Sequence, residues 1–406
     1  MCGILFLLCA ANADHGTLET LRELFPKLQE AICSRGPDAQ DTICYDMLQA
    51  KLTFSASELR LRGDAFIKQP HTDEKGNILC WNGEIFEGIE VRADENDGAK
   101  LLEALQGAEH QQDVVNVFGR IEGPHVAPDE PIDLLNVAFE NPRKIAVRVD
   151  GNVGGLPKRE KKQKLREPLD YSTVKVSFDV PDRLTGLQEL EELRRLCPNR
   201  TWNFLEINVP FDESQNARPI VEALMFPSRT VMDMSLAIAL YFAARAEGQI
   251  RTHPGAEPTP YTSPARVLLN GLGSDELLGG YGRHRTAFKA AGWQAVIDEL
   301  QLEIDRIPTR NLGRDDRVIS SWGKETRHPF LSLSVVNFLA QLPVHMKMDP
   351  RLESGLGEKL LLRLAARKVG LVEASSRKKR AMQFGSHSAR MAPGEGDKKG
   401  DILIET

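Results

Sequence analysis

The chain has 406 residues, of which 41% are hydrophobic and 27% charged, a composition typical of a globular protein with two or three domains. Its formal net charge of −6 argues against a surface built to bind nucleic acid, and no apolar run reaches the roughly 18 residues that span a bilayer. The six scattered cysteines exclude a disulfide scaffold, so we expect reduced thiols and a cytoplasmic protein without nucleic-acid or membrane partners.

The apolar N-terminus allows two interpretations. Residues 4–11 followed by Ala11-Asn12-Ala13 have the outline of a signal peptide with a cleavage site. The alternative is a buried first strand. We prefer the strand because the first basic residue is Arg22, whereas signal peptides carry positive charge ahead of the apolar run.

Residues 1 to about 123 mix predicted strands with predicted helices. Apolar residues at helical spacing between Leu18 and Ile32 predict the first helix. Strands are predicted over 42–47, 51–62 and 78–81, and further helices over 98–106 and 113–118. We therefore expect a mixed α/β domain.

From residue 132 the pattern changes to short apolar strands that alternate with helices. The strands are predicted over 132–139, 202–209 and 266–270, and the clearest helices over 185–197 and 357–370. This alternation predicts βαβ units around a parallel sheet. The lysine-rich run 150–168 and the polar residues from 392 predict a solvated loop and a disordered tail.

The second residue carries the first chemical signal. Removal of Met1 would leave Cys2 with a thiol and an α-amine on one residue. A free α-amine has a pKa of about 7.7–8.0, so near neutral pH part of it can accept the thiol proton. This arrangement is that of an N-terminal nucleophile, in which one residue supplies both nucleophile and base.

Three turn motifs follow Cys2 in the first 84 residues: Arg35-Gly36-Pro37-Asp38, Gln69-Pro70 and Asn82-Gly83-Glu84. Together with Met-Cys-Gly-Ile, and in this order, they resemble the class II glutamine amidotransferase domain of asparagine synthetases. The resemblance implies that Cys2 attacks the glutamine amide, and that Asn82 and Gly83 form the oxyanion hole. The alternative interpretation is a set of glycine-containing turns with structural roles only.

The same resemblance implies a set of substrate-binding residues. Asp97 matches the family aspartate that holds the α-amine of glutamine, and Glu84 completes the Asn-Gly-Glu motif. An arginine should bind the substrate carboxylate, and either Arg60 or Arg62 could be that residue. The register of the motif leaves this choice open.

A second signal lies between Val267 and Tyr281, where a strand, a glycine turn and an acidic helix start follow one another. Asp275 and Glu276 would stand at the carboxyl end of a parallel strand, where α/β sheets bind ligands. Paired carboxylates there suit Mg²⁺ bound to a nucleotide phosphate. Their alternative role is to cap a helix N-terminus.

This segment resembles the Ser-Gly-x-Gly-Ser-Asp-Glu motif in the ATP-pyrophosphatase domain of asparagine synthetases. The resemblance is strongest to the eukaryotic asparagine synthetase domain-containing proteins, through the stretches DEPIDLLNVAF, NLGRDDRVI and GEKLLLRLAA. It implies ATP and Mg²⁺ as cofactors. It also implies a nucleotide or metal site at Gly271, Gly273, Ser274, Asp275, Glu276 and Lys379.

Two departures from the family pattern bear on activity. The family binds pyrophosphate with a Ser-Gly-Gly-x-Asp-Ser loop, and this chain contains no Ser-Gly-Gly. The loop belongs between Pro124 and Asp129, which indicates an internal deletion there. The family also places a catalytic glutamate where this chain has Leu272, which cannot accept a proton.

We therefore expect an α/β protein with two domains. Residues 1–124 are predicted to form a truncated N-terminal nucleophile glutaminase domain. Residues 129–390 should form a doubly wound α/β ATP-pyrophosphatase-like synthetase domain without its pyrophosphate loop, and 391–406 a disordered tail. The implied function is glutamine hydrolysis at Cys2, supplying ammonia to an ATP-dependent aspartate ligase whose activity and ATP binding we expect to be impaired. The alternative is a non-catalytic interaction or regulatory protein on the same scaffold.

Overall fold

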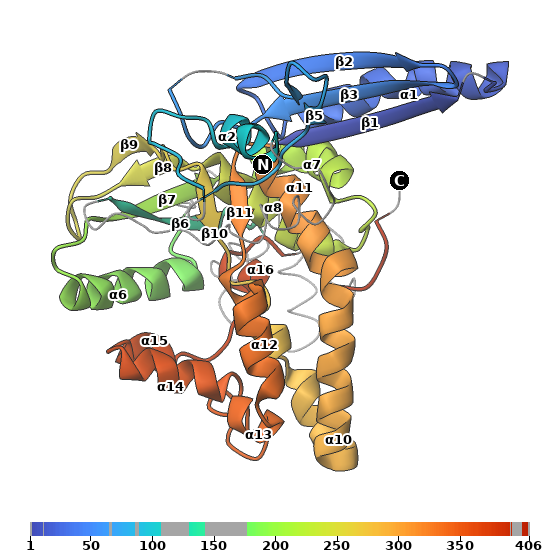
Figure 1. The fold of residues 1–406 in the computed structure, drawn as a ribbon. Coiled ribbons are helices and arrows are strands. Elements are labelled where there is room, and N and C mark those ends of the chain that lie inside the picture. The colour runs from blue at the N-terminus through green and yellow to red at the C-terminus, as the bar shows by residue number, and fades with distance from the viewer. Residues whose placement is uncertain are drawn as a thin grey trace, which may run out of the picture. The chain divides into compact units, whose positions relative to one another are not determined.

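The computed structural model describes residues 2–10, 12–64, 67–85, 89–106, 130–142, 177–389, 391 and 400–404. The chain divides into two compact units, whose elements are labelled in Figure 1. Unit 1 comprises Met1–Pro128, Arg266–Leu268 and Ile319–Thr326. Unit 2 comprises Asp129–Ala265, Leu269–Val318 and Arg327–Thr406.

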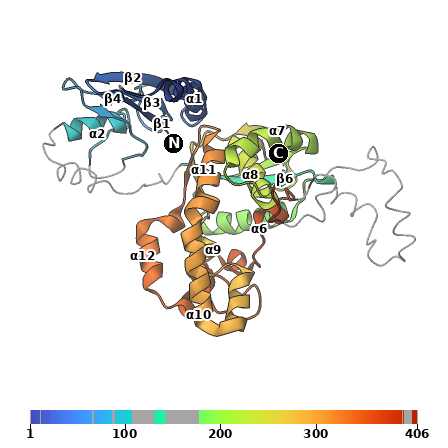
Figure 2. The same cartoon turned by 90° about the vertical axis from the view of Figure 1, so that its right-hand side faces the viewer.

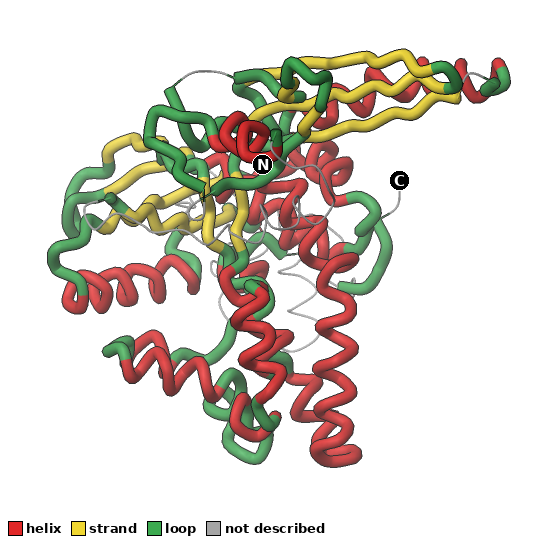
Figure 3. Tube along the Cα trace, viewed as in Figure 1, coloured by secondary structure: helices red, strands yellow, loops and turns green. Residues whose placement is uncertain are grey.

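Unit 1 is built on a three-stranded antiparallel sheet with the order β1-β3-β2 (Figure 3). Its strands are β1 (Gly3–Ala10), β2 (Ala39–Met47) and β3 (Ala50–Glu58). The apolar N-terminal run thus forms β1, which pairs with β3 along its full length. Helix α1 (His15–Cys33) lies against one face of the sheet, where Gln29 Nε2 donates to Thr42 Oγ1 at 3.0 Å.

The opposite face of this sheet is apolar and exposed. Ile4, Phe6 and Leu8 of β1 are 41%, 51% and 57% exposed, and Tyr45 and Met47 of β2 are 52% and 56% exposed. The strand register places all five on the face turned away from α1, because side chains alternate along a strand. Such a face normally packs against a second layer, and no such layer covers it among the residues of unit 1 that the structure describes.

The remaining elements of unit 1 are short. Strands β4 (His71–Thr72) and β5 (Ile78–Leu79) pair with each other, and α2 spans Asp97–Leu105. Of the strand predicted over 78–81, only the first two residues form β5. The helix predicted over 98–106 is confirmed as α2. The predicted helix over 113–118 lies outside the described residues.

Unit 2 contains a four-stranded sheet with the order β6-β7-β8-β9. Strands β6 (Ile132–Phe139) and β7 (Trp202–Val209) pair in parallel, as predicted, through the crossover helix α6 (Pro181–Leu196). Strands β8 (Glu247–Ile250) and β9 (Thr259–Thr262) are antiparallel, so the expectation of a purely parallel sheet is wrong for this edge.

The predicted strand over 266–270 does not extend this sheet. It forms β10 (Val267–Leu269), which pairs with β11 (Glu325–Arg327) in a separate two-stranded sheet. In the described part of the chain β6 has a strand partner on one side only. This edge position is what the predicted deletion between Pro124 and Asp129 leads us to expect, and the deletion itself stays a prediction.

Helices cover both faces of the four-stranded sheet (Figures 1 and 2). Helix α6 lies on one face, while α7 (Phe211–Met225) and α8 (Val231–Arg245) lie on the other. The main core forms between the sheet and α7 and α8, where Phe139, Leu205 and Ile207 are at most 1% exposed. This two-sided cover agrees with the predicted α/β architecture.

The rest of unit 2 is helical. Its elements are α9 (Ser274–Leu278), α10 (Gly282–Ile307), α11 (Gly313–Ser320), α12 (Leu333–Gln341), α13 (Val344–Lys347), α14 (Leu360–Lys368), α15 (Val372–Ser376) and α16 (Met382–Gly385). Helix α10 bends at Gly292, whose φ of +70° is outside the helical region. Among the helices described, none combines the length and apolarity required to cross a membrane.

Candidate functional site

Cys2 lies buried at the start of β1, 8% exposed. Its Sγ accepts a hydrogen bond from the backbone N–H of Leu59 at 3.4 Å and one from Gln69 Nε2 at 3.7 Å. Burial raises the pKa of the Cys2 thiol, and the Leu59 contact offsets only part of that rise. The thiol is therefore held protonated and needs a base to become a nucleophile.

Asn82 lies against Cys2, as the sequence predicts. The backbone N–H of Cys2 donates to Asn82 Oδ1 at 3.0 Å. Gly83 and Glu84 follow in the same loop, and a side chain at Gly83 would come within 2.5 Å of the Trp81 ring. Gln69 connects this loop with the thiol, because its Oε1 accepts the backbone N–H of Trp81 at 2.7 Å while its Nε2 donates to Cys2 Sγ. The Gln-Pro motif thus contacts the Cys2 thiol directly.

Asp97 is the first residue of α2 and is 8% exposed. Its Oδ2 accepts the Ile85 N–H at 3.1 Å, and its Oδ1 accepts the Gly98 N–H at 2.9 Å. Burial raises the pKa of the Asp97 carboxyl despite these bonds and the nearby charge of Arg62. Both carboxylate oxygens thus accept backbone hydrogen bonds, one of them from Ile85, which directly follows the Asn82-Gly83-Glu84 motif.

The two candidate arginines differ in their surroundings. Arg62 donates to the Ile85 carbonyl, and its charge acts on Asp97. Arg60 instead donates to the backbone carbonyl of Asp64 at 2.7 Å, in an exposed position. The structure therefore brings Arg62, rather than Arg60, beside Asp97.

The Arg-Gly-Pro-Asp motif supports the end of β3. Asp38 Oδ2 accepts the backbone N–H of Arg60 at 2.8 Å, and the Arg266 guanidinium binds both carboxylate oxygens of Asp38. Burial opposes ionisation of Asp38, but the Arg266 bonds outweigh it and lower its pKa. Sequence reasoning missed Arg266, because 228 positions separate it from Asp38.

The second candidate centre is the turn between β10 and α9. The Leu272 N–H donates to Asn270 Oδ1 at 2.9 Å, and Ser274 Oγ donates to the Gly271 carbonyl at 2.8 Å. Gly273 has a φ of +95°, and a side chain there would come within 2.4 Å of Leu331. The glycine pattern of this motif is thus required by backbone conformation and close packing.

Asp275 is enclosed by two lysines. Lys359 Nζ lies 2.9 Å and Lys379 Nζ 2.8 Å from Asp275 Oδ1, and Lys359 also donates to Ser274 Oγ at 3.0 Å. Burial alone would raise the pKa of Asp275, but the two ammonium groups outweigh it and lower that pKa. Lys379 was predicted at this site, whereas Lys359 was missed; its signal was the GEKLLLRLAA stretch.

Glu276 points into the protein and is 2% exposed. Its Oε1 accepts from Tyr281 Oη at 2.5 Å and from Asn311 Nδ2 at 3.1 Å. The described residues hold no cluster of three or more side chains suited to a metal. The two lysines compensate the charge of Asp275, and Glu276 is hydrogen-bonded inside the protein. This pair therefore does not fit the Mg²⁺ site that the sequence predicts. The two lysines suit an anion instead.

Comparison with known proteins identifies the second unit. Residues 289–397 match the asparagine synthase family. The chain is also 43% identical over 288 residues to asparagine synthetase domain-containing protein 1 of Gallus gallus, and 37% identical over 276 residues to an asparagine synthetase domain-containing protein of Saccharomyces cerevisiae. Each match covers 68% of this chain and 44% of the relative, so the chain spans less than half of their length.

An archaeal relative matches a shorter stretch. It is a putative glutamine-hydrolysing asparagine synthetase of Methanocaldococcus jannaschii, 37% identical over 84 residues, which is 21% of this chain and 16% of the relative. These matches confirm the predicted resemblance to asparagine synthetase domain-containing proteins. The glutamine amidotransferase assignment of residues 1–124 stays a prediction, because the family match begins at residue 289.

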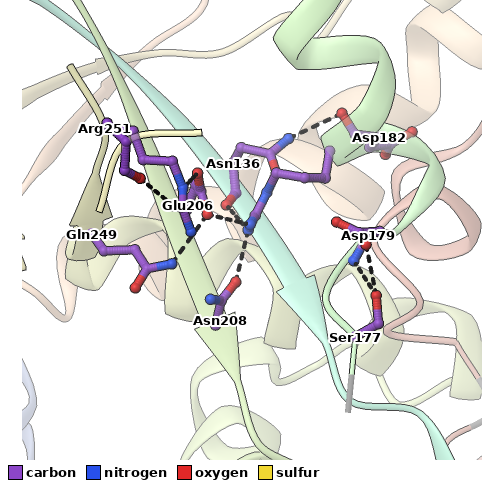
Figure 4. Close-up of polar contacts among 10 residues, drawn as sticks. Asn136, Ser177, Asp179, Asp182, Glu206, Asn208, Gln249 and Arg251 are labelled. Atoms are coloured by element: carbon purple, nitrogen blue, oxygen red, sulfur yellow. Dashed lines mark hydrogen bonds and ion pairs between the residues drawn. The ribbon is translucent and has the colours of Figure 1, made fainter. Parts of the chain in front are cut away.

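Unit 2 also holds a buried polar network that the sequence did not predict (Figure 4). Arg183 of α6 is 3% exposed and donates to Asn136 Oδ1 at 2.5 Å, Glu206 Oε2 at 3.2 Å and Asn208 Oδ1 at 3.0 Å. Burial lowers its pKa to about 10, although Glu206 counters the effect. Because each guanidinium nitrogen has a partner, the network fastens α6 to β6 and β7.

A cavity of about 480 Å³ adjoins this network. Its walls carry both signs of charge, and it is lined by Asn136, Asp182, Thr185, Gly186, Glu189, Arg377, Lys378 and Arg380. The arginines are engaged with the acids, since Arg380 lies 3.6 Å from Asp182 and Arg377 lies 3.5 Å from Glu189. The cavity therefore offers no unpaired arginine to a ligand.

Proposed function

We propose that residues 1–124 form a glutaminase that hydrolyses glutamine at Cys2, within an asparagine synthetase-like protein whose ligase step this chain does not complete. One observation carries the proposal. The Cys2 N–H contacts Asn82 at 3.0 Å while its sulfur contacts Leu59 and Gln69, so segments up to 80 positions apart converge on one thiol. Such convergence suits a nucleophile and its oxyanion donors better than a set of independent turns.

The chemistry follows from these contacts. Once Met1 is removed, the α-amine of Cys2 accepts the thiol proton, and the thiolate attacks the amide carbon of glutamine. The α-ammonium returns its proton to the amide nitrogen as the tetrahedral intermediate collapses, so that ammonia leaves and a thioester remains. Water then hydrolyses the thioester to glutamate and the free thiol. Asn82 turns its Oδ1 toward Cys2, so its Nδ2 end is the one that can donate to the oxyanion, together with the Gly83 N–H.

Substrate binding is assigned to the groups around Ile85. Asp97 is proposed to pair with the α-amine of glutamine and Arg62 with its α-carboxylate, and Glu84, which directly precedes Ile85, completes the proposed set. The positions of Asp97 and Arg62 support this, because both contact the backbone of Ile85. A pair of opposite charges at this spacing matches the zwitterion of an amino acid.

The synthetase half, proposed to span 129–390, is assigned a reduced role. Members of the asparagine synthase family bind ATP, and in the full reaction ammonia would attack an activated aspartate. Lys359 and Lys379 are suited to hold phosphate beside Ser274. The chain lacks the Ser-Gly-Gly loop and has Leu272 in place of the glutamate. We therefore propose that it binds MgATP weakly and does not ligate.

Covalent trapping tests the glutaminase proposal. A glutamine analogue with a diazoketone in place of the amide should alkylate Cys2 at one equivalent, and free glutamine should protect it. Peptide mass spectrometry locates the adduct and reports whether Met1 is absent. Cys2→Ala should remain unlabelled, whereas Cys197→Ala, at an exposed cysteine, should label fully. Labelling spread over several cysteines, or unaffected by glutamine, would reject the proposal.

A second candidate is a non-catalytic interaction or regulatory protein on the same scaffold. The observation in its favour is the exposed apolar face of the unit 1 sheet, together with the missing phosphate loop. The same trapping experiment separates the two, since a non-catalytic protein has no reason to select the glutamine analogue at Cys2.

A further inference from the structure

Glu58 is a buried carboxyl group that the proposed reaction does not use. It ends β3 and is 2% exposed. Its Oε1 accepts a hydrogen bond from Asn96 Nδ2 at 2.9 Å. Its Oε2 is buried without a hydrogen-bond partner in the part of the chain that the structure describes. A buried carboxylate in this position would leave much of its charge uncompensated.

The Glu58–Asn96 bond joins two parts of the candidate glutaminase centre. On the β3 side, Leu59 follows Glu58 and donates its N–H to Cys2 Sγ at 3.4 Å. On the α2 side, Asn96 is the N-cap, with its Oδ1 accepting the Ala99 N–H at 3.0 Å. The next residue is Asp97. The Glu58–Asn96 contact thus connects the end of β3, which contacts the thiol through Leu59, with α2, which begins with the proposed amine ligand Asp97.

The charges around Glu58 favour its neutral form. Burial has the largest effect, and Asp38 and Asp97 add acidic charge from the turn before β2 and from α2. Arg60, which follows β3, and the Asn96 bond act in the opposite direction. The result is that the pKa of Glu58 rises from its ordinary value of 4.5 to about 7.

We propose that Glu58 is a positioning residue, which in its neutral form fastens the N-cap of α2 to the end of β3 and so sets the spacing between Asp97 and Cys2. The role in glutamine binding rests on the proposed function. When Glu58 loses its proton, the Asn96 bond is kept, but the burial of the new charge and its repulsion by Asp38 and Asp97 outweigh that bond and push α2 away from the end of β3. The same charge raises the pKa of the Cys2 thiol, so ionisation impairs both binding and attack.

The first test needs no enzymatic activity. Glu58→Gln keeps the size of the side chain and imitates its neutral form, and Glu23→Gln, at an exposed site on α1, is the control. A carboxyl whose folded pKa is raised destabilises the fold as pH climbs from 4.5 to about 7. Between pH 5 and pH 8 the unfolding temperature of the wild type should therefore fall relative to Glu58→Gln. Glu23→Gln should follow the wild type.

The same proteins also report on the thiol. The rate of Cys2 alkylation, followed by peptide mass spectrometry, should have its pH midpoint at a lower pH in Glu58→Gln than in the wild type. Equal pH dependence of both unfolding temperature and alkylation in the wild type and Glu58→Gln would overturn the proposal, because Glu58 would then not titrate between the two pH values.

The second test separates positioning from a merely structural role. The KM for glutamine should rise through about pH 7 in the wild type and stay level in Glu58→Gln. Asn96→Ser keeps a good N-cap but cannot reach Glu58, so its KM should be raised at every pH while kcat changes little. A pH-dependent KM in Glu58→Gln like that of the wild type would overturn the positioning role. If no variant hydrolyses glutamine, the proposed function fails, and the alkylation result alone decides whether Glu58 acts on Cys2.

Discussion

In the Cys2 centre, the thiol accepts hydrogen bonds from amide groups of Leu59 and Gln69, and Asn82 binds the Cys2 backbone N–H. The sheet that supports this centre leaves Phe6 and Leu8 51% and 57% exposed. In the Asp275 centre the scaffold is densely packed, with Glu276 and Leu277 at most 4% exposed, yet Leu272 stands where the family has a base. The first region combines the predicted chemical groups with a sheet that has one exposed apolar face, whereas the second has a tightly packed turn without the predicted phosphate loop and base.

The difference teaches that motif retention and fold retention are separate properties. The glycine motif at 271–276 survives because packing against Leu331 and the backbone conformation of Gly273 require it. Its presence is therefore weak evidence for ligase chemistry. The contacts around Cys2 have no comparable packing explanation for the choice of a thiol, so that residue type points to reactivity.

The largest expected effect concerns the nucleophile. Cys2→Ala should lower the rate of glutamine hydrolysis by several orders of magnitude, because it removes the covalent route and leaves only binding and the oxyanion donors. A coupled assay for glutamate measures the rate, with Cys197→Ala as the matched control. Normal glutamine hydrolysis by Cys2→Ala would show that Cys2 is not the nucleophile of this reaction.

The next effect concerns the Asp275 centre. Without the phosphate loop, MgATP should bind at millimolar rather than micromolar concentration, a difference of about 4 kcal/mol. Isothermal calorimetry measures the affinity. Leu272→Glu should not restore pyrophosphate exchange dependent on aspartate, because a base does not replace a phosphate site. Micromolar binding of MgATP would mean that Lys359 and Lys379 hold the phosphates without the loop. The Asp275 centre would then retain more of its chemistry than we propose.

A smaller effect sharpens the substrate assignment. Asp97→Asn should raise the KM for glutamine by roughly tenfold or more, since a charge-assisted contact contributes about 1.5–3 kcal/mol. Arg62→Gln should act in the same direction, and Arg60→Gln should change KM far less, because Arg60 contacts Asp64 instead. Steady-state kinetics decides between them. An unchanged KM with reduced kcat would assign Asp97 to catalysis or structure instead of binding.

The smallest effect on stability is expected at the open sheet face. Phe6→Thr keeps strand propensity and replaces a side chain that is 51% exposed, so the free energy of unfolding should change by less than about 1 kcal/mol. Self-association should decrease, because exposed apolar patches promote it. Light scattering at several concentrations measures this. A severe loss of stability would show that the face is covered in solution.

Sequence reasoning located the local features and missed the distant ones. The bounds of β6 and β7 follow from two short, largely apolar runs, and both strands form as predicted. The pairing of β10 with β11 could not be predicted, because it joins residues almost 60 positions apart. Secondary structure was predictable because its signal lies within a few residues.

The site residues divide along the same line. Cys2, Asn82 and Asp97 belong to short motifs and were predicted, and the structure brings Cys2 and Asn82 together. The choice of Arg62 over Arg60 needed the position of Ile85, and Lys359 needed its contact with Asp275 across 84 positions. Burial, which determines the pKa of Glu58, is a property of the folded chain that no motif reports.

Product analysis of one reaction tests the contrast between the two regions most directly. The purified chain is incubated with glutamine, aspartate and MgATP, and glutamate, ammonia and asparagine are quantified together. We expect glutamate and ammonia to accumulate in equal amounts, without asparagine and independently of ATP. Asparagine formed in proportion to glutamate would contradict the account by showing that the Asp275 centre ligates. The absence of glutamate would contradict the proposal that Cys2 hydrolyses glutamine.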